Sequence, residues 1–132
     1  MKSKASKVVL DWLERADSDF AFAELSFKEF DNFYSQMCVL CHDAVEKYLK
    51  AYLISQKKQY KKIHDLVTLI KDCINISKHK RFNTFEDGCR ILNNYYTPLK
   101  YPSHYPFATR KQASEAIEIA KKIRDFIKNI IL

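Results

Sequence analysis

The chain has 132 residues, which is enough for one domain and too few for two of ordinary size. Hydrophobic residues make up 47% of the chain and aromatic residues 14%, and this content excludes a disordered tail. The sequence contains only 1 Gly and 3 Pro. Because sheet proteins need many tight turns, this scarcity favours long helices with few connections. Lys and Arg number 23 against 16 Asp and Glu, and the net charge of +7 allows an anionic partner without requiring one.

The cysteines indicate no metal site. They are Cys38, Cys41, Cys73 and Cys89. Three of them occupy apolar positions of helical patterns, where a free cysteine acts as a small hydrophobe. Cys38 and Cys41 have the spacing of half a zinc or redox motif, but no second half follows. We therefore expect no metal and no cofactor.

Features of the sequence also bear on location. Unpaired, buried thiols suit the reducing cytoplasm. The first residues are basic, but acidic residues follow at once, so we expect no signal peptide. No apolar run approaches the length of a membrane span, and we expect no contact with a membrane.

The first predicted helix covers residues 7–30. Its apolar residues recur at spacings of three and four, which places them on one stripe. They are Val9, Trp12, Leu13, Ala16, Phe20, Ala23 and Phe27. Asp31 and Asn32 then break the pattern.

The second predicted helix covers residues 33–56. Its apolar residues span an unusually wide arc, which predicts a central helix with several neighbours. Glu46 and Lys50 have the spacing of a favourable ion pair, which we place on the outer face.

Two shorter helices are predicted next, over residues 64–77 and 83–96, each after a basic connection. Pro98 should end or kink the second of them. Residues 100–108 contain Pro102 and Pro106 and predict a loop.

The last predicted helix covers residues 111–131, where apolar residues alternate at four and three. The whole pattern predicts a single all-α domain over residues 1–132, an antiparallel up-and-down bundle of four long helices plus one short helix.

Strict alternation of helix directions would bring the chain start, the connection at 57–63 and the loop at 100–110 to one end of the bundle. This end would carry ten of the 23 basic residues. These are Lys2, Lys4, Lys7, Lys57, Lys58, Lys61, Lys62, Lys100, Arg110 and Lys111. Lysines interleaved with aromatic rings suit single-stranded nucleic acid. The alternative is a set of solvated lysines at helix ends.

Five short motifs, in order along nearly the whole chain, resemble those of the HEPN domain family. They are Trp12-Leu13-Glu14-Arg15-Ala16, the stretch from His42 to Ala51 containing AVEKYLKA, His64-Asp65-Leu66, Leu92 to Tyr96 leading into Lys100-Tyr101-Pro102, and the closing amphipathic helix. The resemblance implies a helical bundle, often dimeric. Many members of the family are metal-independent ribonucleases, frequently toxins that a minimal nucleotidyltransferase partner neutralises, and others bind nucleotides or are inactive.

The active members use an Arg followed four to six residues later by a His. Lys100 and His104 are the nearest equivalents in this chain, with Lys in place of Arg and with a short spacing. A neutral His can accept the proton of a 2′-hydroxyl, whereas Lys lacks the planar fork with which Arg holds two phosphate oxygens. Lys100 therefore suits phosphate binding better than catalysis.

These residues define the predicted site. His104 and Lys100 are the catalytic candidates, and Tyr101 would stack on a base or brace the loop. Nucleotide or RNA phosphates would also meet the cluster of His64, Lys57, Lys58, Lys61 and Lys62. A structural role at a helix start is the alternative for His64.

The predicted function is phosphate binding to nucleotide or RNA by a homodimer that works with a minimal nucleotidyltransferase, as in toxin–antitoxin systems. The alternatives are an active ribonuclease toxin and a non-catalytic interaction protein. His42, on the predicted central helix, is expected to be buried at a helix contact.

Overall fold

The computed structural model describes residues 5–60, 62–96 and 106–132. Every regular element in these ranges is a helix, which confirms the all-α class. The elements are α1 (Lys7–Glu29), α2 (Tyr34–Ser55), α3 (Leu66–Ile76), the 3₁₀-helix η1 (Lys80–Phe85), α4 (Glu86–Asn93) and α5 (Arg110–Ile131). The fourth predicted helix, over residues 83–96, is thus divided, because residues 83–85 belong to the 3₁₀-helix and residues 86–93 are α-helical.

Side-chain caps fix the starts of three helices. The Ser6 hydroxyl accepts from the Val9 amide at the start of α1, and the Asp65 carboxylate accepts from two amides at the start of α3. Thr109 and Gln112 form a capping box at the start of α5. Such caps satisfy amides that have no partner within the helix, so these boundaries are encoded locally.

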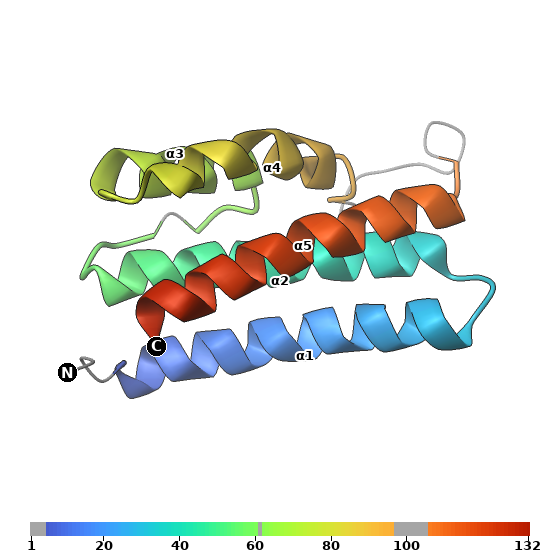
Figure 1. Ribbon diagram of the computed structural model, residues 1–132, viewed down its shortest axis with the longest axis horizontal. Coiled ribbons are helices and arrows are strands. Elements are labelled where there is room, and N and C mark those ends of the chain that lie inside the picture. Colours follow the sequence, from blue (N-terminus) through green and yellow to red (C-terminus); the bar gives the residue numbers. More distant parts are fainter. Residues whose placement is uncertain (1–4, 61, 97–105) are drawn as a thin grey trace.

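The helices form two layers (Figure 1). The long helices α1, α2 and α5 lie side by side, and the shorter α3, η1 and α4 form a second layer over α2 and α5. α2 is the central element, as its wide apolar arc predicts, since it contacts all four other α-helices. Its buried apolar residues are Met37, Cys38, Cys41, Ala44, Val45, Tyr48, Leu49, Ala51, Tyr52 and Leu53.

The helix directions alternate except at α3. His64, just before α3, contacts His42 of α2, and Cys73, near the end of α3, contacts the carbonyl of Leu49. Both pairs advance in the same sense, so α3 runs parallel to α2 rather than antiparallel to it. The cause is the connection between α2 and α3, whose described residues 56–60 and 62–65 run back along α2 before α3 begins, as the green trace in Figure 1 shows.

Because α3 runs parallel to α2, the predicted gathering of basic residues at one end of the bundle is wrong in part. Tyr60 packs edge-to-face on Trp12, so the 57–60 segment does lie beside the start of α1. Arg110, however, bonds to Tyr34 at the other end of α2. The 22 residues of α2 separate the two ends by about 33 Å. Lys57 and Lys58 are therefore far from the start of α5, where Arg110 and Lys111 lie.

The cysteine thiols are buried and none forms a disulfide. Burial raises the pKa of Cys38 to about 11 and that of Cys89 to about 12. A thiol with so high a pKa is a poor nucleophile and a poor metal ligand, so these side chains act as small apolar groups. No helix in the described ranges has the length and apolar character of a membrane-spanning segment.

Candidate functional site

A group of polar and aromatic side chains gathers where the 62–65 segment crosses the middle of α2. Three of its members, His42, Glu46 and Lys50, are four residues apart and therefore share one face of α2. We call the group the histidine cluster. It comprises His42, Asp43, Glu46, Lys50, His64 and Tyr96.

The ion pair of Glu46 and Lys50 is buried. The Nζ of Lys50 donates to Oε2 of Glu46 at 2.7 Å, and the residues are only 4% (Lys50) and 8% (Glu46) exposed. The ammonium also lies 5.2 Å from the ring centroid of Tyr60 and 5.9 Å from that of Trp12. The sequence predicted this ion pair. Its predicted position on the outer face of the helix is wrong, because the connection after α2 folds back and Tyr60 covers this side of the helix.

Glu46 also holds His64. The Nδ1 of His64 lies 2.9 Å from Oε1 of Glu46, and the imidazole is 52% exposed. A carboxylate only accepts, so Nδ1 carries the proton and Nε2 of the neutral ring keeps its lone pair. Within the described residues, Nε2 has no hydrogen-bond partner. The pair has the arrangement of a carboxylate that orients a histidine base.

His42 has the opposite environment. It is fully buried, as expected, and both of its ring nitrogens face acceptors. Nε2 lies 3.0 Å from the carbonyl oxygen of His64, and Nδ1 lies 3.0 Å from Oδ1 of Asp43. A ring nitrogen that carries a proton can donate to either oxygen. His42 thus anchors the backbone of His64 while His64 itself stays accessible.

Tyr96 contacts both histidines of the cluster. Its ring stacks on His64 at a centroid distance of 4.8 Å and an interplanar angle of 21°. It also stacks on His42 at 5.4 Å and 25°. Stacked rings fix the orientation of both imidazoles. The chain continues from Tyr96 into the segment that contains Lys100 and His104.

A metal ion fits this cluster poorly. His42, Asp43 and Glu46 each offer one ligand atom, and these atoms lie within 4.8 Å of one another. Each already has a protein partner, however, and the Lys50 ammonium at 2.7 Å from Glu46 supplies the positive charge that a cation would bring. A metal would have to displace these contacts against the repulsion of Lys50.

The structure brings only part of the predicted site together. Of its described members, His64 lies in the histidine cluster, and Lys62 is exposed two residues before it. Lys57 and Lys58 lie beyond the end of α2, where Lys57 has a φ of 58° and the Lys58 amide donates to Leu53. The other members, Lys61, Lys100, Tyr101 and His104, lie outside the described residues.

Sequence reasoning missed the role of the polar residues of α2. The available signal was the apolar arc itself, because residues 44–53 of α2 are apolar on nearly every side. A charged pair at 46 and 50 within such a stretch has little room on an outer face, which favours burial as a compensated pair.

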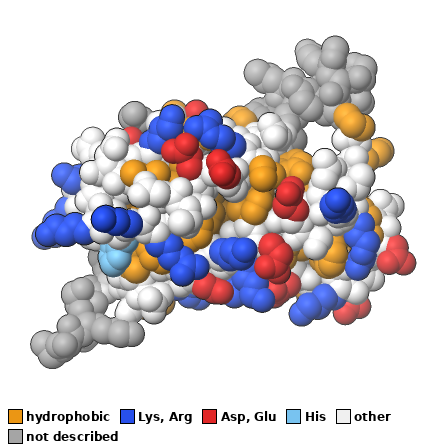
Figure 2. All heavy atoms as spheres, turned by 45° about the horizontal axis from the view of Figure 1, so that its top comes forward, with side chains coloured by type: hydrophobic (Ala, Val, Ile, Leu, Met, Phe, Trp, Pro, Cys, Tyr) orange, Lys and Arg blue, Asp and Glu red, His pale blue; other side chains and the backbone are white. Residues whose placement is uncertain are grey.

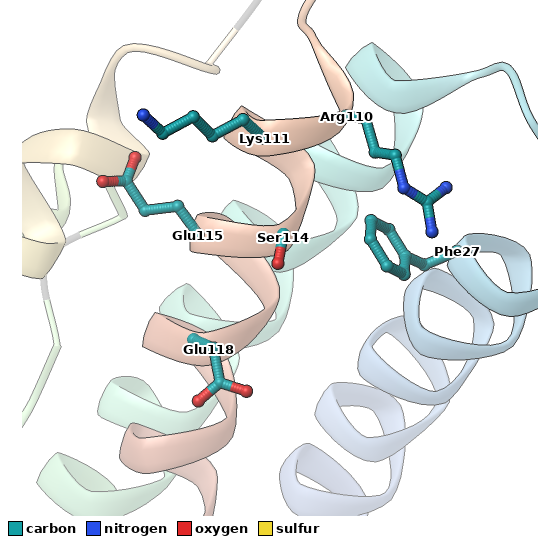
Figure 3. A pocket seen from close by; sticks show the side chains of 6 residues that line it. All are labelled: Phe27, Arg110, Lys111, Ser114, Glu115 and Glu118. Carbon is teal, nitrogen blue, oxygen red and sulfur yellow. The ribbon is translucent and has the colours of Figure 1, made fainter.

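Two hollows lie near the C-terminal end of α1. One, of about 760 Å³, is shown in Figure 3 and is lined by Phe27, Arg110, Lys111, Ser114, Glu115 and Glu118. The Arg110 guanidinium lies over the Phe27 ring, 4.3 Å from its centroid, whereas Lys111 and Glu115 point away from them. Its charges are mixed and do not converge, so it is a weaker candidate than the histidine cluster.

The second hollow is an apolar groove of about 220 Å³. It is lined by Phe22, Ser26, Phe30, Phe33, Gln36, Met37 and Leu40. Phe22 is 63% exposed, and Phe33 has a positive φ of 68° that is rare for a bulky side chain. An exposed aromatic groove of this kind suits contact with another protein.

The fold and the cluster define a class of protein: a small helical bundle with a buried charged pair on its central helix. The chain belongs to the HEPN domain family, which it matches over residues 9–130. It is similar to the crystal structure of TT1696 from Thermus thermophilus, at 25% identity and a TM-score of 0.75, covering 94% of this chain and 98% of that one. It is also similar to ST0689, an archaeal HEPN homologue, at 25% identity, a TM-score of 0.73 and the same coverage. No protein of curated function matches significantly.

Proposed function

We propose that this HEPN-domain chain binds the phosphates of RNA or of a nucleotide beside the histidine cluster and works with a minimal nucleotidyltransferase partner, in a system of the toxin–antitoxin type. The proposal rests on the environment of the His64 side chain. Its Nδ1 is held by Glu46, its ring lies against Tyr96, and half of the side chain remains open to a ligand.

The sequence next to this point supplies the remaining groups. Lys62 lies two residues before His64, and Lys100, Tyr101 and His104 follow Tyr96 within eight residues. Lysine provides charge for a phosphate, and tyrosine provides a face for a base. In this proposal Lys100 contacts the phosphate, Tyr101 stacks on the base or braces the loop, and His104 acts with His64 at the ligand.

Ribonuclease activity is the second candidate, and the Glu46–His64 pair favours it. A neutral imidazole whose Nδ1–H is held by a carboxylate presents a basic Nε2, which could take the proton of a 2′-hydroxyl. Charge developing on the phosphate would then be met by Lys100. Because lysine makes no bidentate contact, cleavage would be slow compared with that by an Arg-containing site.

Assembly into a homodimer is part of the same proposal. The apolar groove around Phe22, Phe30 and Phe33 supports it, because three exposed aromatic rings along α1 and its connection to α2 cost solvation free energy in a monomer. Light scattering of the purified chain tests it: Phe22→Ser with Phe33→Ser should lower the mass to that of a monomer.

The binding site is tested with a fluorescently labelled single-stranded RNA of about 12 nucleotides and anisotropy titrations. Lys100→Ala with His104→Ala should weaken binding about tenfold, in line with one or two lost phosphate contacts. The control is Arg15→Ala with Lys28→Ala, which removes two exposed cations from α1. Equal affinities of the site variant and the wild type would refute this site.

Two substitutions of His64 separate binding from proton transfer. In His64→Asn the side-chain amide can replace Nδ1 as donor to Glu46, but no base remains at the position of Nε2. In His64→Gln the amide reaches instead toward the Nε2 position. If His64 is a base, both variants lose RNA cleavage, while His64→Asn retains the stability of the wild type. Cleavage that survives in both variants would show that His64 is not the base.

A further inference from the structure

A further hollow with a different character lies between η1 and α5. Its volume is about 570 Å³, and we call it the basic hollow. It is lined by Lys80, Arg81, Thr84, Phe85 and Lys122. Three of the five lining residues are cations, and none is an acid.

These cations are available to a ligand. Lys80, Arg81 and Lys122 are exposed and form no ion pair with any described residue. In contrast, Arg124 on the same helix pairs with Asp125, and Lys128 pairs with Asp17. Three unpaired positive charges around one hollow repel one another, and an anion placed among them relieves that repulsion.

Arg81 is oriented in advance. Its guanidinium carbon lies 5.9 Å from the ring centroids of both Phe85 and Phe126. Its carbonyl oxygen accepts from the Thr84 hydroxyl at 2.7 Å, which holds the backbone of η1. A guanidinium resting on aromatic rings loses less freedom when it binds, and its fork matches two oxygens of one phosphate.

The hollow adjoins further positive charge. Phe82 packs on Tyr52 near the end of α2 at a centroid distance of 4.7 Å, so η1 lies at the end of the molecule where Lys57 and Lys58 follow α2. Lys78 lies just before η1. Figure 2 shows Lys and Arg side chains gathered with a histidine toward the left end of this face. The positive surface is therefore larger than the area that one small ligand would cover.

We propose that the basic hollow binds the phosphodiester backbone of single-stranded RNA, with Arg81 holding one phosphate and Lys80 and Lys122 the flanking charge. An open surface lined by separate cations follows a polyanion better than it encloses a mononucleotide. This inference rests on the proposed function for its ligand, but it places binding on η1 and α5, away from Lys100 and His104 in sequence.

The test compares double variants in anisotropy titrations with the same labelled RNA, from about 50 to about 300 mM salt. Arg81→Ala with Lys122→Ala should weaken binding about tenfold and lower the slope of log affinity against log salt by about one to two. Arg15→Ala with Lys28→Ala removes the same charge from α1 and should change the affinity less than about twofold.

The outcomes separate the two proposals. If only the Lys100/His104 variant loses affinity, the basic hollow is overturned and the proposed function stands. If only the Arg81/Lys122 variant loses affinity, the hollow is the RNA site and the proposed site fails. Equal losses of affinity in the control and in the Arg81/Lys122 variant would show that only the overall positive charge matters, and would overturn the proposal for the hollow. A wild type without measurable RNA binding would overturn both.

Discussion

The histidine cluster and the basic hollow use positive charge in opposite ways. In the cluster, Lys50 is buried, bonded to Glu46 and covered by two aromatic rings. At the hollow, Lys122 and Arg81 are exposed and unpaired within the described residues. A buried ammonium is held in place because its desolvation must be compensated, whereas an exposed one keeps its hydration until a ligand arrives.

This difference indicates which residues determine stability and which determine binding. Residues of the cluster are coupled, since Glu46 joins Lys50 to His64 and His42 anchors the backbone beneath them. Substitution of one should affect the others. The three cations of the hollow form no ion pair with described residues, and their removal should leave the fold intact. Four predictions test this contrast, in order of the expected change in the free energy of unfolding.

The largest effect is expected for Lys50→Met. The substitution leaves the Glu46 carboxylate buried beside only His64, and breaking a buried pair in this way costs about 3–5 kcal/mol. Urea denaturation followed by circular dichroism measures the change. The double variant Glu46→Gln/Lys50→Met should recover at least half of the loss, because no uncompensated charge remains. A single variant as stable as the wild type would show that the pair is hydrated rather than buried.

Lys47 provides the matched control on the same helix. Its Nζ donates to Asp19 at 2.6 Å, but about a quarter of each side chain is exposed. Solvent screening limits such a pair, so Lys47→Met should cost less than about 1 kcal/mol. Comparable losses of unfolding free energy in Lys47→Met and Lys50→Met would show that the buried pair is no more important for stability than the surface pair.

A smaller effect is expected at Asp65, which caps α3 directly after His64. Its carboxylate accepts from the amides of Val67 and Thr68 and from the side chain of Asn93. Asp65→Ala removes the cap and the link to α4, at a cost of about 1–2 kcal/mol. Thermal unfolding measures it, and Thr109→Ala at the start of α5 is a comparable cap without a link between helices. Equal losses would show that the Asn93 contact adds nothing.

The same carboxylate predicts a pH dependence. The hydrogen bond from Asn93, followed by those from Thr68 and Val67, lowers the pKa of Asp65 below its ordinary value. Its contribution is therefore present above about pH 4 and is lost as the pH falls through the lowered pKa. Asp65→Asn should reduce this dependence, so the stability difference between wild type and variant should shrink toward about pH 2. A constant difference would argue against the ionised cap.

The sequence predicted the elements better than their arrangement. Periodicity located α1, α2 and α5 to within a few residues, because each carries a continuous apolar stripe, and α1 and α5 also begin at side-chain caps. The path of residues 56–65 could not be predicted in this way. That connection carries no periodic signal, and its return along α2 depends on distant contacts such as that of Tyr60 with Trp12.

The same limit applies to the site. His64 was a candidate from the sequence through the His64-Asp65-Leu66 motif, but its carboxylate partner, Glu46, lies 18 residues earlier in the chain. Neither the spacing of Glu46 and Lys50 nor their charge indicates that a later segment buries them. The basic hollow was also hidden, because Lys122 joins Lys80 and Arg81 only through the packing of η1 against Phe126 on α5.

The smallest effect on stability is expected for Arg81→Ala with Lys122→Ala, and this prediction sharpens the contrast most directly. Neither residue has an ion-pair partner within the described chain, so the free energy of unfolding should change by no more than about 0.5 kcal/mol. Relief of repulsion with Lys80 could even stabilise the fold slightly, an effect that about 0.5 M salt should remove by screening. Urea denaturation at low and high salt measures both. A loss above about 1.5 kcal/mol would mean that Arg81 holds η1 through its rings, and the hollow would then be part of the core rather than a surface kept free for a ligand.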